Sequence, residues 1–292
     1  MKRAVKKKPL QSRHLSRRAV LQLLGASAAG ALVGSASEAY AAAQQPSAHE
    51  PNGTSRVVPL PAKPGPMAID AAKTAVIVCD MQNDFGTKGG MFDRAGIDIS
   101  RIQQAVGPTA RVLAAARNAG MKIIYLKMAF RPDLSDLGSE DSPNRARHLH
   151  FGVGESVPAP DGTASRVLIR DTWHTDIVPE LKPQAEDILL YKHRFSGFYQ
   201  TELDAILKRM GIRFLIVTGC TTSVCVESTI RDGMFRDYSC VLLSDCSAEP
   251  IGQSFPRSNH EASLLTIQTI LGWVATSEDF IQALAAPLAG KP

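Results

Sequence analysis

The stretch TAVIVC, residues 74–79, is followed directly by Asp80 and decides the fold class of this sequence. A continuous apolar run of this length, without polar alternation, is typical of a strand whose two faces are both buried. Such a strand needs helices on either side of its sheet. We therefore expect strands and helices to alternate along the chain.

Short apolar runs and amphipathic stretches do alternate beyond this strand. The pattern predicts an α/β fold, a three-layer α-β-α arrangement in which helices cover both faces of a parallel sheet. Residues 131–186 show little regular pattern, and we expect a loop-rich insertion over the functional site there. The expected strands are 122–128, 188–191, 214–218, 240–243 and 273–275, and the expected helices are 101–119, 201–210, 223–235 and 260–270.

The N-terminus has the pattern of an export signal. Residues 1–18 are basic and end in a pair of arginines, a mildly apolar Gly/Ala-rich stretch follows at 19–36, and small residues at 39–43 offer cleavage sites. The apolar stretch is too short and too weakly hydrophobic to predict a transmembrane span. We therefore expect a twin-arginine signal peptide at 1–43 and a periplasmic or secreted protein with no membrane attachment after cleavage. An uncleaved N-terminal anchor is the alternative.

Proline marks the next boundary. Residues 44–67 contain six prolines with Ser, Gly, Asn and Thr between them and little periodicity, which is typical of a linker. The single folded domain is then expected at 68–286. It is long enough to bury a core without disulfide bonds.

Charge and cysteine content exclude several classes of protein. The formal net charge is +5, but residues 1–43 hold eight basic and one acidic side chain, so the rest carries 25 basic and 27 acidic ones. The folded part therefore lacks the basic excess of a nucleic-acid-binding domain. Five cysteines at irregular spacing, with no CxxC pair, fit neither a disulfide framework nor a structural zinc site. Most of them are expected to pack in the core.

Three reactive side chains follow the predicted strands. Ligands of parallel sheets bind outside the carboxyl ends of the strands. Asp80 ends the first strand, Lys192 follows the strand at 188–191, and Cys225 lies just past the strand at 214–218, at the start of a helix. A carboxylate, an ammonium group and a thiol in these places indicate a cysteine hydrolase.

The chemistry suggests a role for each group. The positive end of a helix and a nearby lysine are expected to lower the pKa of the Cys225 thiol, and the thiolate is the nucleophile. Asp80 would accept the proton and later deliver it to the leaving amine. Lys192 would hold the carboxylate and stabilise the thiolate. Backbone N–H groups in the turn 219–225 would form an oxyanion hole.

Three motifs resemble those of the isochorismatase-like cysteine hydrolases: DMQNDF at 80–85, the strand end at Lys192, and TGCTTSVCV at 218–226. The resemblance covers roughly residues 68–286. It implies a six-stranded parallel sheet and a catalytic triad of Asp80, Lys192 and Cys225. It also implies a non-proline cis peptide at Cys220–Thr221, with the amides of Thr221 and Cys225 as oxyanion donors.

Further stretches resemble two groups within this family. SGFY at 196–199 with Thr201, CVESTIRDG at 225–233 and GWV at 272–274 resemble ureidoacrylate amidohydrolases, whereas GG at 89–90 with Asp93 and RPDLSDL at 131–137 resemble biuret hydrolases. Both groups cleave linear amides and release ammonia. The resemblance therefore implies an amidohydrolase that cleaves a C–N bond of a small linear amide or ureido compound through a thioester intermediate.

Several alternatives stay open. Nicotinamidases of this family carry histidine metal ligands, but no histidine lies between Asp80 and Phe130, so we expect no metal and no cofactor. Isochorismate cleavage does not need the cysteine that this chain keeps. A nicotinamidase-like enzyme, an N-carbamoyl amino-acid amidase and an exported small-molecule binding protein are the remaining alternatives, while a thiol redox protein would need a CxxC motif. The resemblance implies a homo-oligomer, a dimer or a tetramer.

The substrate pocket is predicted from residues near the motifs: Phe85, Arg131, Trp173, Phe198 and Tyr199. Arg131 would bind a substrate carboxylate through both guanidinium N–H groups. Asp84 is expected to have a structural role in its loop.

The histidines are secondary candidates. His148 and His150 are expected on the solvated surface, and His193 is disfavoured as a partner of the thiol because adjacent strand residues point to opposite faces. His174 and His260 stay possible partners. A disulfide between Cys220 and Cys246 is possible, but their spacing does not demand it.

Overall fold

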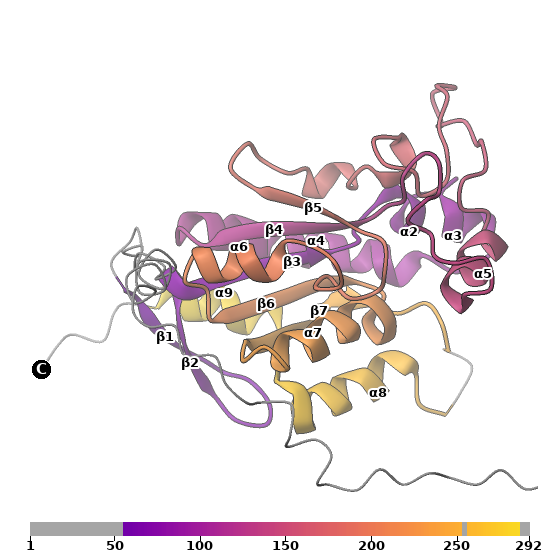
Figure 1. Ribbon diagram of the computed structural model, residues 1–292. Coiled ribbons are helices and arrows are strands. Elements are labelled where there is room, and N and C mark those ends of the chain that lie inside the picture. The colour runs from indigo at the N-terminus through magenta and orange to yellow at the C-terminus, as the bar shows by residue number, and fades with distance from the viewer. Residues whose placement is uncertain (1–54, 253–255, 287–292) are drawn as a thin grey trace, which may run out of the picture. The chain divides into compact units, whose positions relative to one another are not determined.

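A six-stranded parallel sheet forms the centre of the domain (Figure 1), with the strand order β5-β4-β3-β6-β7-β8. This computed structural model describes residues 55–252 and 256–286. The sheet confirms the predicted α/β class and the six strands that the resemblance implied. The strands are β3 (Thr74–Cys79), β4 (Lys122–Met128), β5 (Ile188–Lys192), β6 (Phe214–Cys220), β7 (Ser239–Ala248) and β8 (Trp273–Ala275).

Helices cover both faces of this sheet (Figure 1), as the alternation predicted. On one face α4 (Ser100–Asn118) and α9 (Ser277–Ala285) pack on the side chains of Val76 and Val78. The other face, with Ala75 and Ile77, is covered by α6 (Leu203–Arg209), α7 (Glu227–Met234) and α8 (Asn259–Thr266). Successive side chains of β3 thus enter two separate cores, which explains why its sequence is apolar throughout.

The expected linker is wrong at its C-terminal end. β1 (Val57–Leu60) and β2 (Met67–Asp70) form an antiparallel hairpin, and the side chains of Val58 and Leu60 are buried in the core. Arg56 donates hydrogen bonds to the carbonyls of Leu284 and Ala286, more than 200 residues later in the sequence. The folded domain therefore begins before residue 68. The six prolines favoured the interpretation as a linker, but proline is tolerated in a peripheral strand such as β1.

The remaining predictions about the N-terminus, the signal peptide and the first part of the linker, fall on residues 1–54 and lie outside the described residues. No helix among the described residues is long and apolar enough to cross a membrane.

The insertion at 131–186 is less irregular than expected, because it contains α5 (Pro143–His150). The Ser142 hydroxyl accepts a hydrogen bond from the Arg145 amide at 3.1 Å, and Pro143 occupies the first position of the helix. A serine cap followed by proline is a recognised helix start. This signal was present in the sequence. Residues of α5 line the cavity of the functional site.

Two shorter helices, α2 (Asn83–Gly86) and α3 (Met91–Arg94), connect β3 to α4. The helix expected at 223–235 begins as a π-helical turn at Thr222–Val226 and continues as α7, and a second π-helical turn at Ile267–Leu271 follows α8. The expected positions of the six sheet strands agree with the structure, although β6 and β7 extend further than their apolar runs.

Candidate active site

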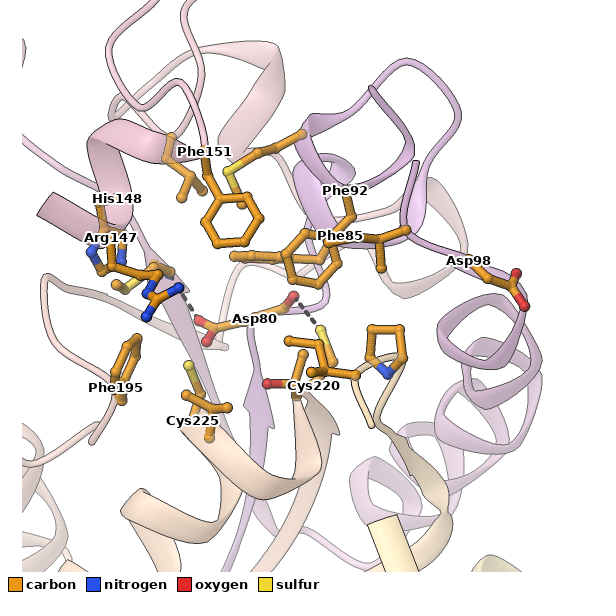
Figure 2. Close-up of a pocket in the computed structure, with 18 of the residues that line it drawn as sticks. Asp80, Phe85, Phe92, Asp98, Arg147, His148, Phe151, Phe195, Cys220 and Cys225 are labelled. Atoms are coloured by element: carbon orange, nitrogen blue, oxygen red, sulfur yellow. Dashed lines mark hydrogen bonds between the residues drawn. The ribbon is translucent and has the colours of Figure 1, made fainter. Parts of the chain in front are cut away.

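Asp80 and Lys192 form a buried ion pair at the carboxyl ends of β3 and β5. Lys192 Nζ lies 2.7 Å from Asp80 Oδ2, and both side chains are almost completely buried. Cys225 and Asp80 line the same cavity, and the thiol of Cys225 points toward the Asp80 carboxylate (Figure 2). The structure thus brings together the three reactive residues that the sequence singled out.

The backbone around Asp80 aims its carboxylate. Asp80 has a positive φ of 54°, a left-handed conformation that Asp tolerates better than most residues. Its N–H donates to the Leu126 carbonyl, and its Oδ1 accepts a hydrogen bond from the Met128 amide at 2.9 Å. The second carboxylate oxygen, Oδ2, faces Lys192 and also accepts a hydrogen bond from the Cys79 thiol at 3.6 Å.

β6 approaches the end of β3 closely, and a glycine makes this possible. A Cβ atom on Gly219, which has a φ of +114°, would meet the Cys79 carbonyl oxygen at 1.9 Å. The next residue, Cys220, donates its thiol hydrogen to the Asp80 carbonyl at 3.1 Å. The peptide bond Cys220–Thr221 is cis, as the resemblance implied.

The turn that carries Cys225 is held by hydrogen bonds on both sides. The amides of Val224 and Val226 donate to the Thr221 carbonyl at 3.1 and 3.2 Å. Glu249, a fully buried residue just beyond β7, accepts hydrogen bonds from the Ser223 amide and from the Ser223 hydroxyl. The sequence analysis did not identify Glu249. It follows β7 but bonds to a turn that follows β6, and no local sequence pattern indicates such a contact.

Burial controls the ionisation of the thiol. Desolvation raises the pKa of Cys225 above its ordinary value, and although the Lys192 charge lowers it, the Asp80 charge raises it further. Burial lowers the pKa of Lys192, but the Asp80 carboxylate outweighs it and the pKa is raised overall. Lys192 thus lowers the pKa of the thiol as expected, but burial penalises the thiolate more, and the pKa is raised overall. Lys192 stays charged and Cys225 keeps its proton.

The cavity above the thiol has a volume of about 660 Å³ and is mainly apolar. Phenylalanine rings form much of its wall, and α5 contributes Arg147 and His148 (Figure 2). The candidate oxyanion donors Thr221 and Cys225 also line it. The aromatic residues of the wall are Phe85, Phe92, Phe151 and Phe195.

Of the five predicted pocket residues, only Phe85 lines this cavity. Phe198 is buried in the core under α6 and α7, where it stacks on Tyr238 at 5.8 Å between ring centroids. Tyr199 is 45% exposed and its ring faces His193. Neither ring lines the cavity, because the loop after β5 turns Phe195 and not Phe198 toward it.

The other two predicted pocket residues, Arg131 and Trp173, also lie outside the cavity. Arg131 is exposed, and its backbone amide donates to the Asp136 carboxylate in a surface turn. The Trp173 ring packs against His174, and its carbonyl accepts a hydrogen bond from Asn83. Neither side chain lines the cavity. Arg147 supplies the cationic side chain instead.

Of the two histidines expected on the solvated surface, His150 is exposed as expected and His148 is not. His148 is buried and not solvated: its Nδ1 lies 2.7 Å from the Asn144 carbonyl, and its ring packs on Phe130 and Phe195. Burial lowers the pKa of His148. His174 hydrogen-bonds to Asp84 and His260 to the Thr222 hydroxyl, and neither lines the cavity.

Asp84 has the expected structural role. Its carboxylate accepts hydrogen bonds from the amides of Met91 and Leu168, two residues that line the cavity. All five cysteines are buried and free, so Cys220 and Cys246 are not joined. Cys79 and Cys240 lie in the core as expected. In the part of the chain that the structure describes, no group of three or more His, Cys, Asp or Glu residues is placed to hold a metal ion.

Comparisons with known proteins agree with this geometry. The model of the Isochorismatase domain family matches residues 74–279, and the chain belongs to this family of hydrolases. It is similar to ureidoacrylate amidohydrolase RutB of Methylorubrum extorquens (strain DSM 6343 / CIP 106787 / DM4), with 40% identity over 237 residues that cover 81% of this chain and 93% of the relative. RutB of Serratia proteamaculans is 40% identical and covers 78% and 90%.

Solved structures show the same fold. A cysteine hydrolase from Pseudomonas syringae pv. phaseolicola 1448A has a TM-score of 0.63 and 30% sequence identity, over 80% of this chain and 99% of that chain. N-carbamoylsarcosine amidase from Thermoplasma acidophilum has a TM-score of 0.52 and 24% identity, over 70% and 97% of the two chains, and resembles this protein in fold. The three motifs therefore identified the family correctly.

Proposed function

We propose that the protein is a cysteine amidohydrolase that cleaves a C–N bond of a small linear amide or ureido compound and releases ammonia. The observation that carries this proposal is the buried Asp80–Lys192 ion pair beside the Cys225 thiol in one cavity. Each charge of the pair compensates the other in the interior, and the pair thereby keeps an ionised carboxylate beside the thiol. The relatives at 40% identity are named ureidoacrylate amidohydrolases, which supports the ureido class of substrate.

In the first half of the reaction the Cys225 sulfur attacks the carbonyl carbon while its proton passes to Asp80. Because the thiol is neutral in the free enzyme, attack and proton transfer are coupled. The amides of Thr221 and Cys225 hold the oxyanion of the tetrahedral intermediate. Asp80 then returns the proton to the leaving nitrogen, the C–N bond breaks, ammonia departs, and the acyl or carbamoyl group stays on sulfur.

In the second half a water molecule attacks this thioester. Asp80 accepts a proton from the water, and the same amides hold the second oxyanion. The C–S bond breaks, the sulfur recovers the proton from Asp80, and the acid leaves. Lys192 stays protonated throughout and keeps the carboxylate in place, as its raised pKa favours.

We also propose export through the twin-arginine route, to the periplasm or beyond, followed by assembly into a dimer or tetramer. The basic segment with its paired arginines supports export, and that route carries proteins that are already folded. Five free, buried cysteines are compatible with it, since they would be shielded before they reach an oxidising compartment. Cell fractionation and light scattering test these two points, and a cytoplasmic protein or a monomer would refute them.

Ammonia release tests the main proposal. The full chain is assayed with ureidoacrylate, biuret, an N-carbamoyl amino acid and nicotinamide, each with and without a chelator. We expect release that Cys225→Ser abolishes and that Cys240→Ser, a substitution in the core, leaves in place. No release from any compound by folded protein would overturn the proposal. Release that the chelator abolishes would overturn the metal-free mechanism.

A further inference from the structure

The cavity contains one positive charge that the mechanism does not use. Arg147 lines it and has no ion-pair partner among the residues that the structure describes, whereas Lys192 is neutralised by Asp80. Figure 2 shows the Arg147 side chain extending from α5 into the cavity on the side of Asp80 and Cys225. The planar guanidinium group matches a carboxylate through two parallel hydrogen bonds.

The side chain of Arg147 is exposed, and its neighbour His148 holds α5 in place. The ring of His148 lies 5.0 Å from that of Phe130 and 5.8 Å from that of Phe195, and its Nδ1 bonds to the Asn144 carbonyl. These contacts anchor the helix against the rest of the domain. The backbone of α5 at Arg147 is therefore held in place beside the cavity.

The charge at the opposite rim has the other sign. Asp98 is exposed at that edge (Figure 2), and its carboxylate accepts a hydrogen bond from the Ser100 amide at 2.9 Å. An anionic substrate is attracted to Arg147 and repelled by Asp98. The field across the cavity thus favours one orientation, with the negative group near the thiol.

The rest of the wall is apolar and leaves room for more than a small polar amide. Phe85 and Phe92 form an edge-to-face pair at 5.0 Å, Phe151 adjoins them, and Phe195 stays 38% exposed at the cavity. A volume of about 660 Å³ lies in the range of sites that enclose drug-sized ligands. An apolar group on the substrate would cover these rings and remove them from water.

We propose that the substrate is a ureido or amide acid that carries a bulky apolar group, such as the N-carbamoyl derivative of an aromatic amino acid. Arg147 binds the carboxylate, the phenylalanine wall binds the apolar group, and Cys225 attacks the carbamoyl carbon. Attack expels ammonia, and water then releases the N-carboxy amine from sulfur. This inference rests on the proposed function and adds the two features by which the site selects its substrate.

The test compares three compounds with the full chain. N-carbamoylphenylalanine, as both enantiomers, has the carboxylate and the ring; N-carbamoylglycine lacks the ring; and phenethylurea lacks the carboxylate. We expect kcat/KM for one phenylalanine enantiomer to exceed those of the other two compounds by about 10-fold or more, because an apolar pocket and a charged contact each discriminate by about that factor.

Two variants separate the two features. Arg147→Gln should lower kcat/KM for the acids by about 10-fold or more and leave phenethylurea almost unchanged. Phe195→Ala should affect N-carbamoylphenylalanine and not N-carbamoylglycine. The matched controls are Arg145→Gln, on the same helix but outside the cavity, and Phe235→Ala, a ring that is 64% exposed elsewhere. Neither control should change the preference.

Binding distinguishes this inference from the proposed function. Calorimetry with the Cys225→Ser protein measures whether N-carbamoylphenylalanine binds more tightly than N-carbamoylglycine and whether Arg147→Gln weakens it. If ureidoacrylate or biuret is hydrolysed but the ring and the carboxylate bring no advantage, the inference is overturned and the proposed function stands. If the selective binding is present but no compound is hydrolysed, the ligand class is supported and the amidohydrolase is refuted.

Discussion

Lys192 Nζ lies 2.7 Å from Asp80 Oδ2, with the two side chains 0% and 1% exposed. The ammonium also donates to the Arg194 carbonyl at 3.3 Å, and the carboxylate accepts the Met128 amide. Each charge is therefore compensated within the interior. This pair makes a carboxylate available beside a thiol in a place where neither charge would persist alone.

Removal of one partner should destabilise the domain. Lys192→Met leaves the Asp80 carboxylate buried without its counter-charge, and we expect a loss of about 3–5 kcal/mol in the free energy of unfolding together with loss of activity. Denaturant unfolding measures it. The double variant Asp80→Asn/Lys192→Met should recover much of the stability but no activity. Equal stability of the single and double variants would show that the pair is not coupled.

The thiol should react slowly in the free enzyme. Because burial raises the pKa of Cys225, its thiolate fraction is small at neutral pH and increases as the pH rises. We expect the rate of iodoacetamide alkylation, followed by mass spectrometry of the Cys225 peptide, to keep rising through pH 9. A plateau near pH 7 would mean that the thiolate is already formed, contrary to this prediction.

The β1–β2 hairpin should contribute to stability. Leu60 is fully buried, so Leu60→Ala should lower the free energy of unfolding by about 2–5 kcal/mol. Val57, in the same strand, is 56% exposed, and Val57→Ala should change it by less than about 0.5 kcal/mol. Thermal or denaturant unfolding measures the stability of the two variants against the wild type. If both substitutions change the free energy of unfolding by equally small amounts, the hairpin is part of the linker and not of the folded domain.

His148 should make the domain sensitive to acid. Its pKa is lowered by burial, so the unfolded chain binds more protons than the folded one as the pH falls through about 6.5, the ordinary histidine value. Stability is therefore lost on the acid side of that value and is unaffected well above it. We expect the wild type to lose more stability than His148→Gln between pH 7 and pH 5. If the stability of the two proteins changes with pH in the same way, His148 is not the source of the acid sensitivity.

The sequence alone determined the parallel sheet, the positions of its strands along the chain and the reactive trio. These follow from local properties: the all-apolar run at 74–79 belongs to a central strand because both of its faces are buried, and parallel strands carry their following residues to one edge. Asp80, Lys192 and Cys225 were accessible to prediction because each lies at the end of a strand or in the turn that follows it.

Only the tertiary structure decided the walls of the cavity and the ionisation of the thiol. Phe195 and Phe198 lie three residues apart in a polar loop, and long-range packing turns one to the cavity and the other into the core. The same packing brings Arg147 over the site from an insertion that carried little periodicity. Burial then outweighs the Lys192 charge in setting the Cys225 pKa. Desolvation depends on everything that surrounds a group, and no stretch of sequence contains that information.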